Sequence, residues 1–125
     1  FSKKLHKLAG SGGAAFWIGF RVIGSVLVIP LVEEMTFRGY LLRRLVSTDW
    51  ENADVARFRF LPFLLSSAAF GLMHGRWLAG TLAGMAYALA FYRRGRLNDA
   101  VVSHMTTNAL IALWVLVTGA WSLWV

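Results

Sequence analysis

Long apolar runs separated by short polar segments dominate the pattern of the chain. The runs lie at residues 14–32, 60–75, 77–92 and 100–125. Crossing the hydrocarbon core of a bilayer, about 30 Å thick, takes roughly 20 helical residues, and each run is at or near that length. The pattern therefore predicts an all-α fold, a polytopic transmembrane helix bundle with about four to five membrane helices.

Pro30 and the polar stretches predict where the helices bend and end. The first apolar run continues well beyond Pro30, which lacks the N–H group that a regular helix needs, so we expect a kink immediately before Glu33. Residues 47–59 are the most polar stretch and predict a loop. Within this loop, Thr48 and Glu51 have the spacing of a capping box, so one surface helical turn is expected there.

Three further helices are predicted after this loop. We expect them at residues 62–75, at residues 77–92, and from Asn98 to the tryptophan-rich end of the chain. Pro62 is tolerated in the first turn of a helix, and Asn98 is a suitable N-cap. Gly80 and Gly84 form a GxxxG pair, which predicts a helix that packs with its backbone close to a neighbour.

Composition supports a membrane protein. The chain is 58% hydrophobic with a mean hydropathy of +0.58. A net charge of +7 is compatible with nucleic-acid binding, but the basic residues form short clusters between apolar runs. Because membrane proteins place cations there, next to anionic headgroups, we expect membrane lipids and no nucleic acid as partners. The absence of cysteine excludes disulfides, thiol catalysis and cysteine zinc sites.

Two regions are predicted along the chain. Residues 1–13 are basic and then glycine-rich, which indicates a juxtamembrane linker, and residues 14–125 indicate one membrane-embedded core. The first residue is Phe rather than Met, and no signal peptide is recognisable. We therefore expect a fragment, with missing N-terminal helices that complete the bundle.

Ionisable side chains inside apolar helices are costly in a membrane, so each one here is a candidate functional residue. Glu33 and Glu34 point about 100° apart on a helix and cannot both address one point. Glu34 lies four residues before Arg38, the favourable order for an intrahelical ion pair. In one interpretation both acids are structural, neutralised by Arg38 and a histidine. In the other, Glu34 and Arg38 form a scaffold and Glu33 is the reactive carboxylate.

Two more segments carry polar side chains one helical turn apart. Phe70 and His74 share one helix face, and His104 and Asn108 share another. Taken singly, a histidine such as His74 in an apolar helix is more often a hydrogen-bonded core residue than a catalyst. The pair of His104 and Asn108 is interpreted equally well as a polar contact that joins helices.

Together, the three segments supply the smallest set of catalytic groups that can hydrolyse an amide in a site that excludes bulk water. Glu33, helped by His74, would deprotonate a water molecule. His104 and Asn108 would hold the oxyanion of the tetrahedral intermediate, where each well-placed donor contributes roughly 3 kcal/mol. We therefore predict one site formed by these four residues.

The same segments match the motifs of a known family in the same order. EEMTFR (33–38) fits EExxxR, FGLMH (70–74) fits FxxxH, and HMTTN (104–108) fits HxxxN. The chain resembles the CPBP family of intramembrane endopeptidases, which includes the CAAX prenyl proteases and bacterial proteins linked to bacteriocin immunity or abortive infection. The resemblance covers about residues 25–115. Two stretches are most similar to the branch found with bacterial exosortase protein-sorting systems: RGYLLRRL, and the segment that runs from HGRWLAGTLAG to RRGRLNDAVVSH.

The resemblance implies a glutamate-dependent protease and assigns its residues. Glu33 and His74 would activate water, and His104 and Asn108 would stabilise the oxyanion. The supporting residues would be Glu34, Arg38 and Phe70. The expected substrate is a membrane-anchored protein or peptide, either CAAX-like or related to protein sorting. The expected location is the bacterial inner (plasma) membrane.

We favour a site without a cofactor. Because the family was long described as metallopeptidases, Glu33, His74 and His104 are the alternative, as a His₂Glu zinc site. The chain contains neither the HExxH spacing nor a cysteine, so no metal signature stands apart from the resemblance.

Two functions of other classes remain alternatives. A transporter or proton-relay bundle also contains buried Glu and His, but would string them along the membrane normal. A non-catalytic immunity or interaction protein would keep the fold without turnover. If each apolar run spans the membrane once, His74 and His104 share a site only when a segment is tilted, broken or re-entrant. Gly75 and Arg76 are the candidate break.

Overall fold

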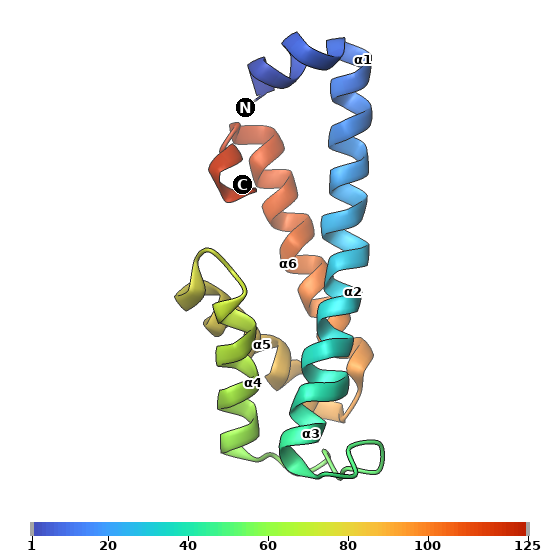
Figure 1. Ribbon diagram of the computed structural model, residues 1–125, viewed down its shortest axis with the longest axis vertical. Helices are drawn as coiled ribbons and strands as arrows, with labels where there is room; N and C mark the ends of the chain where they lie inside the picture. The colour runs from blue at the N-terminus through green and yellow to red at the C-terminus, as the bar shows by residue number, and fades with distance from the viewer. Residues whose placement is uncertain (1, 125) are drawn as a thin grey trace. The chain divides into compact units, whose positions relative to one another are not determined.

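The structure is a computed structural model that describes residues 2–124, without the side chains of residues 2, 5, 6, 8 and 9. Every regular element in this range is a helix, which confirms the all-α fold class (Figure 1). The α-helices are α1 (Ser2–Ile23), α2 (Ile29–Glu34), α3 (Leu42–Val46), α4 (Phe60–Leu72), α5 (Trp77–Arg94) and α6 (Leu97–Thr118). The π-helices η1 (Gly24–Val28) and η2 (Met35–Leu41) and the 3-10 helix η3 (Trp121–Leu123) complete the order.

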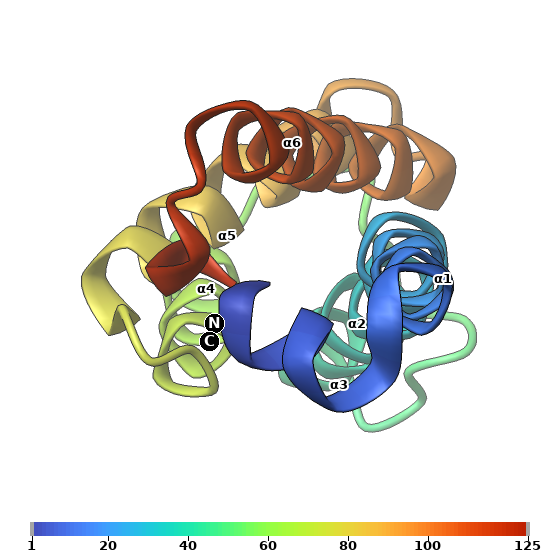
Figure 2. The same cartoon turned by 90° about the horizontal axis from the view of Figure 1, so that it is seen from above.

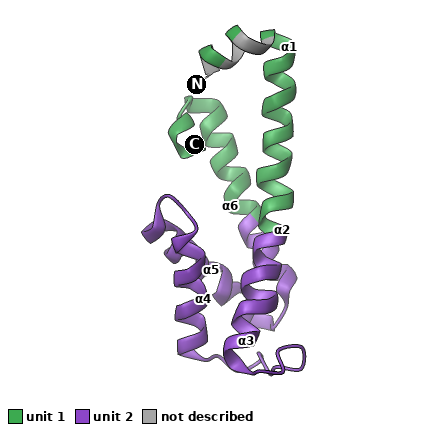
Figure 3. Cartoon of the chain, in the orientation of Figure 1, with its two compact units in different colours: residues 1–30, 105–125 green, residues 31–104 purple. Residues whose placement is uncertain are grey.

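The chain divides into two compact units (Figure 3). One consists of Phe1–Pro30 and Met105–Val125, and the other of Leu31–His104. The boundary of the membrane core at residue 14 stays a prediction. The segment expected to be a linker is helical from Ser2 onward, with non-helical torsion angles at Gly10 (φ 68°, ψ 176°).

In the part of the chain that the structure describes, two helical stretches are long and apolar enough to cross a membrane. Gly10–Val46 covers 37 residues, and its apolar 18-residue window has a mean hydropathy of 2.0; the corresponding window of Leu97–Thr118 has a mean hydropathy of 1.7. Phe60–Leu72 is apolar but shorter. The structure therefore supports a helical membrane protein, whereas the expected four to five membrane helices are not confirmed by the described part of the chain.

The irregularity expected near Pro30 takes the form of π-helical turns on both sides of α2. Ile29 N–H donates to the carbonyl of Gly24, five residues back, directly before Pro30. A second such turn, η2, begins directly after Glu34. Wider turns relieve the crowding that a proline ring causes in a regular helix, and π-bulges are frequent at functional sites. The two acidic residues thus lie on a short α-helical segment between two π turns.

The loop at residues 47–59 is confirmed, but the predicted capping box is wrong. No helix begins at Thr48; instead the Asp49 N–H donates to the Ser47 hydroxyl at 3.2 Å, because Ser47 is the C-cap of α3. The predicted N-cap at Asn98 is also wrong, since α6 already begins at Leu97.

Helix α4 includes Pro62 in its first turn, as predicted, but it ends at Leu72 rather than near Gly75. The segment that follows, residues 73–76, is a non-helical turn that connects α4 to α5. His74 therefore lies in a break between two helices and not inside a helix. The break predicted at Gly75 and Arg76 is present.

Helices α4 and α5 pack closely against each other in the Leu31–His104 unit (Figures 1 and 2). A Cβ atom placed on Gly80 would come within 3.1 Å of the Cα of Gly71, and one on Gly84 within 3.2 Å of the carbonyl oxygen of Ser67. Only glycine permits this approach, which confirms the packing predicted from Gly80 and Gly84. Phe70, from α4, is almost fully buried between the two helices and the acidic segment.

We expect Gly71→Ala to destabilise the protein by about 1–3 kcal/mol, because overpacking a tight contact forces the backbones apart. A Cβ at this position would lie 2.6 Å from the backbone nitrogen of Thr81 and from the carbonyl oxygen of Trp77. Gly75→Ala is the matched control, since a Cβ there meets nothing within 4 Å. Thermal unfolding in detergent measures both variants; equal midpoints for the two would contradict the packing described.

Candidate active site

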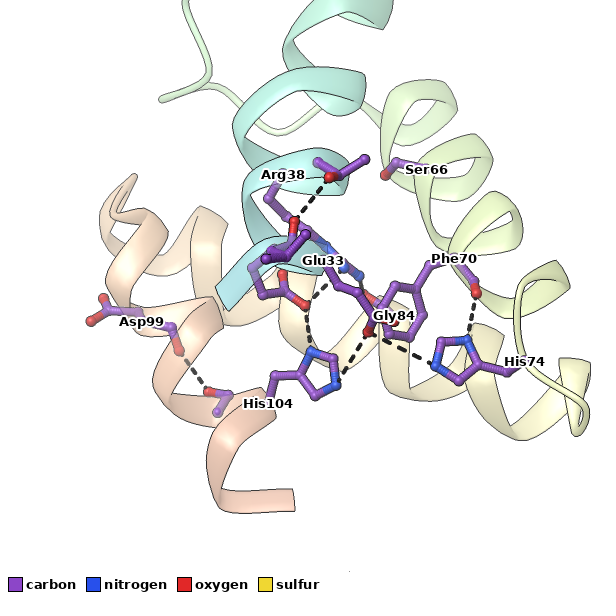
Figure 4. A network of polar contacts seen from close by, with 12 residues as sticks. Glu33, Arg38, Ser66, Phe70, His74, Gly84, Asp99 and His104 are labelled. Atoms are coloured by element: carbon purple, nitrogen blue, oxygen red, sulfur yellow. Dashed lines mark hydrogen bonds and ion pairs between the residues drawn. The ribbon is translucent and has the colours of Figure 1, made fainter. Parts of the chain in front are cut away.

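Six of the seven site and supporting residues predicted from the sequence lie in the Leu31–His104 unit, and their side chains meet around the acidic segment (Figure 4). They come from α2 and η2, from the end of α4 and the turn after it, and from α6. The six are Glu33, Glu34, Arg38, Phe70, His74 and His104. The cluster can therefore be described within one compact unit.

The predicted ion pair of Glu34 and Arg38 is present and fully buried. Arg38 Nη1 lies 3.0 Å from Glu34 Oε1, and both side chains are 0% exposed. Arg38 Nη2 donates a second hydrogen bond to the carbonyl of Gly84 on α5. The guanidinium carbon also lies 4.8 Å from the centre of the Phe70 ring, within the range of a cation–π contact. Arg38 thus ties the acidic segment to α4 and α5.

Glu34 also binds His104, so this acid is neutralised by Arg38 and a histidine, as one interpretation of the sequence expected. His104 Nδ1 lies 2.9 Å from Glu34 Oε1, the same oxygen that accepts from Arg38. The His104 ring stacks on Tyr87, with 4.4 Å between ring centres and an interplanar angle of 14°. Glu34 and Tyr87 together fix the orientation of the His104 ring.

Glu33 differs from Glu34 in its surroundings. Its side chain is 21% exposed, and its Oε2 lies 3.7 Å from His104 Nε2 and 4.0 Å from His74 Nε2. Both distances exceed that of a direct hydrogen bond, so Oε2 has no direct partner in the described part of the chain.

His74 presents one specific ring nitrogen to Glu33. Its Nδ1 lies 2.7 Å from the carbonyl oxygen of Phe70, and a carbonyl only accepts, so Nδ1 carries the proton. In the neutral ring, Nε2 then carries the lone pair that faces Glu33. The Phe70 ring lies 4.5 Å from the imidazole and limits its rotation. Because Phe70 lies four residues before His74, its carbonyl accepts a hydrogen bond from the His74 ring and its own ring limits the rotation of that ring.

Asn108 belongs to the other unit. There its Nδ2 donates to the carbonyl of Ser25 at 2.8 Å. Asn108 follows His104 by one turn of α6, as predicted. Its place in an oxyanion hole stays a prediction.

Two residues of α5, Tyr87 and Gly84, contact the site but were not predicted from the sequence to be site residues. Tyr87 follows Gly84 by three residues, so it lies on the same helix face as the glycine pair that packs against α4. A polar aromatic residue on the helix face that carries the packing glycines is the feature of the sequence that could have predicted the place of Tyr87. The carbonyl of Gly84 carried no signal at all, because every residue has one.

The zinc alternative at Glu33, His74 and His104 stays a prediction. Among the side chains that the structure describes, no group of three or more His, Cys, Asp or Glu residues is arranged to hold a metal ion. The second nitrogen of each histidine is bound to Phe70 or Glu34, so only the Nε2 atoms and Glu33 face one another.

A comparison with protein families matches residues 15–110, most of the chain, to the Rce1-like description "Type II CAAX prenyl endopeptidase Rce1-like". The chain belongs to this Rce1-like family. The match includes all three motifs and confirms the resemblance predicted from them. A search of curated proteins and a search of solved structures gave no match. The family and the two apolar helices identify the chain as a membrane protein of an endopeptidase family.

We expect Arg38→Lys to lower the free energy of unfolding by about 1.5–3 kcal/mol. An ammonium group keeps the charge but lacks the planar fork that reaches Glu34 and the Gly84 carbonyl together. Arg44→Lys, at an exposed position, is the control. Chemical denaturation in detergent measures the difference, and an Arg38→Lys variant as stable as its control would argue against the bridging role.

Proposed function

We propose that the chain is an intramembrane endopeptidase that hydrolyses a peptide bond of a membrane-anchored substrate with water activated by Glu33 and His74. The observation that carries the proposal is the position of Glu33 Oε2, 3.7 and 4.0 Å from the Nε2 atoms of two histidines. Membership in the Rce1-like family supports the endopeptidase class. The mechanism follows from the chemistry of the three side chains.

Glu33 and His74 serve as the water-activating pair. A water molecule held between Glu33 Oε2 and His74 Nε2 loses a proton to this pair as its oxygen attacks the peptide carbonyl. The proton then passes to the nitrogen of the leaving amine, so that water and amide become a carboxylic acid and an amine. Glu33 returns to its starting charge.

His104 and Asn108 serve as the oxyanion donors. The negative charge that develops on the carbonyl oxygen is stabilised by N–H groups aimed at it, in a site that excludes bulk water. His104 Nε2 lies 3.7 Å from Glu33 Oε2, which supports this assignment. The assignment of Asn108 follows from its position one helical turn after His104.

The proposed chemistry uses no metal ion. Activation of water by a carboxylate and an imidazole is sufficient for this chemistry. The proposed location is the bacterial inner membrane, and the substrate is CAAX-like or related to protein sorting. The convergence of polar side chains on Glu33 favours this function over a proton relay, which would need a row of groups across the membrane. A non-catalytic immunity protein would not need the Oε2 atom of Glu33 to face two histidines without a hydrogen-bond partner among the described residues.

We expect Glu33→Gln to reduce peptide cleavage by about 10²–10⁴-fold, because an amide cannot accept the proton of the attacking water. The measurement is cleavage of a membrane-anchored CAAX-type peptide by purified protein in lipid vesicles. Glu51→Gln, the same change in the exposed loop, is the matched control and keeps full activity.

The same assay with a metal chelator tests the metal-free mechanism. Cleavage should persist at the rate measured without chelator. Activity that survives Glu33→Gln would refute the role of Glu33, and activity lost on chelation and restored by zinc would replace the mechanism with a zinc site.

A further inference from the structure

A second polar site lies in the Leu31–His104 unit, at the turn that joins α5 to α6. There a cavity of about 300 Å³ is lined by residues from the end of α5 and the start of α6. The Asp99 side chain, which lines this cavity, points away from Glu33 and His104 (Figure 4). The cavity is therefore separate from the candidate active site. Its lining combines two guanidinium groups, a carboxylate, a hydroxyl and two apolar side chains: Arg93, Arg94, Asp99, Ser103, Ala90 and Val102.

The two arginines of the cavity are exposed and have no counter-ion in the described part of the chain. Every ion pair among the described residues involves Glu33 or Glu34. Arg93 and Arg94 lie in the last turn of α5, where a positive charge stabilises the negative end of the helix dipole. That role explains their charge but not a shared cavity. Neighbours on a helix point about 100° apart, so the two guanidinium groups approach the cavity from different directions.

The cavity lies where a polar turn meets an apolar helix. Helix α6, which begins at Leu97, is long and apolar enough to cross a membrane. Val102 lies one turn further into this helix than Asp99, and its side chain is 60% exposed. On α5, Ala90 lies one turn further into the apolar run than Arg93. The lining thus changes from charged to apolar in the same direction on both helices, as expected for a site that holds a phospholipid at the boundary of the hydrocarbon core.

The charged groups of the cavity indicate which headgroup it accepts. A guanidinium fork matches the oxygens of a phosphate, and two arginines beside one carboxylate leave one positive charge to balance a phosphodiester. The backbone of Asp99 is bonded within the protein, because its N–H donates to the Arg96 carbonyl and its carbonyl accepts from the Ser103 hydroxyl. Its carboxylate would repel a bare anion but would accept a hydrogen bond from a hydroxyl group beside the phosphate.

We propose that this cavity binds the headgroup of an anionic phospholipid with a polyol next to its phosphate, of the phosphatidylglycerol type. Arg93 and Arg94 hold the phosphodiester, Asp99 accepts from a headgroup hydroxyl, and Ala90 and Val102 contact the apolar part of the lipid. A bound headgroup links the end of α5 to the start of α6. The site goes beyond the proposed function and does not depend on it.

Native mass spectrometry of the full chain in detergent, titrated with single lipids, tests the site. Phosphatidylglycerol is compared with phosphatidylmethanol, which has the same charge and phosphodiester but no headgroup hydroxyl. We expect phosphatidylglycerol to bind about ten-fold more tightly, the effect of one hydrogen bond to a charged group. Inorganic phosphate at the same concentration should not displace it. Equal affinity for the two lipids, or displacement by phosphate, would overturn the proposal.

The double variant Arg93→Gln with Arg94→Gln should lower the affinity for phosphatidylglycerol by at least about ten-fold. Its matched control is Arg43→Gln with Arg44→Gln, which removes a neighbouring pair of arginines from α3, outside the cavity. The control should bind within about two-fold of the wild-type protein. An equal loss in both double variants would show a general attraction of interfacial cations for anionic lipid and would overturn the site.

Asp99→Asn tests the role of the carboxylate. Asparagine is also favoured near the start of a helix, so the variant should fold, and its thermal midpoint checks this. The preference for phosphatidylglycerol over phosphatidylmethanol should fall below about two-fold, because the repulsion of a bare phosphodiester is gone. An unchanged preference would refute the contact of Asp99 with the headgroup. None of these measurements needs a peptide substrate, so their outcome is independent of whether the protein cleaves peptides.

Discussion

The buried carboxylate of Glu34 is the interaction on which the rest of the site depends. One of its oxygens accepts from both Arg38 and His104, although His104 lies 70 residues away in the sequence. An isolated buried carboxylate is costly, so both partners must stay in place for the folded state to be stable. Once they do, the second bond of Arg38 fixes α5, and the ring of His104 has one orientation. The position of Glu33 against both histidines follows from these constraints.

The backbone around Glu34 is adapted to this requirement. A π turn before Pro30 and another after Glu34 leave the two acids on a short regular segment, where they point in different directions. Gly84 completes the arrangement on the opposite side, since a Cβ there would lie 3.2 Å from Arg38 Nη2. The glycines of α5 thus serve two purposes: they permit close helix packing and they leave room for a charged side chain.

The sequence was sufficient for the parts of the fold and site that depend on local spacing. The all-α class, the loop at residues 47–59 and the Glu34–Arg38 pair follow from periodicity and from the geometry of one helical turn. Which histidine contacts Glu34 could not be predicted, because the answer depends on how distant helices pack. The capping box at Thr48 and the N-cap at Asn98 were wrong because neighbouring residues had already ended or begun the helices. The place of Asn108 beside the other site residues is still a prediction.

The most direct test of the central claim is chemical rescue of Glu33→Ala. Removing the side chain takes away the base but leaves space beside His74 for a small carboxylate such as formate. The account predicts that Glu33→Ala does not cleave peptide alone and that added formate restores cleavage in a saturable way. It predicts no such rescue for Glu34→Ala, in which the buried charge network itself is broken. Full cleavage by Glu33→Ala without formate would contradict the account.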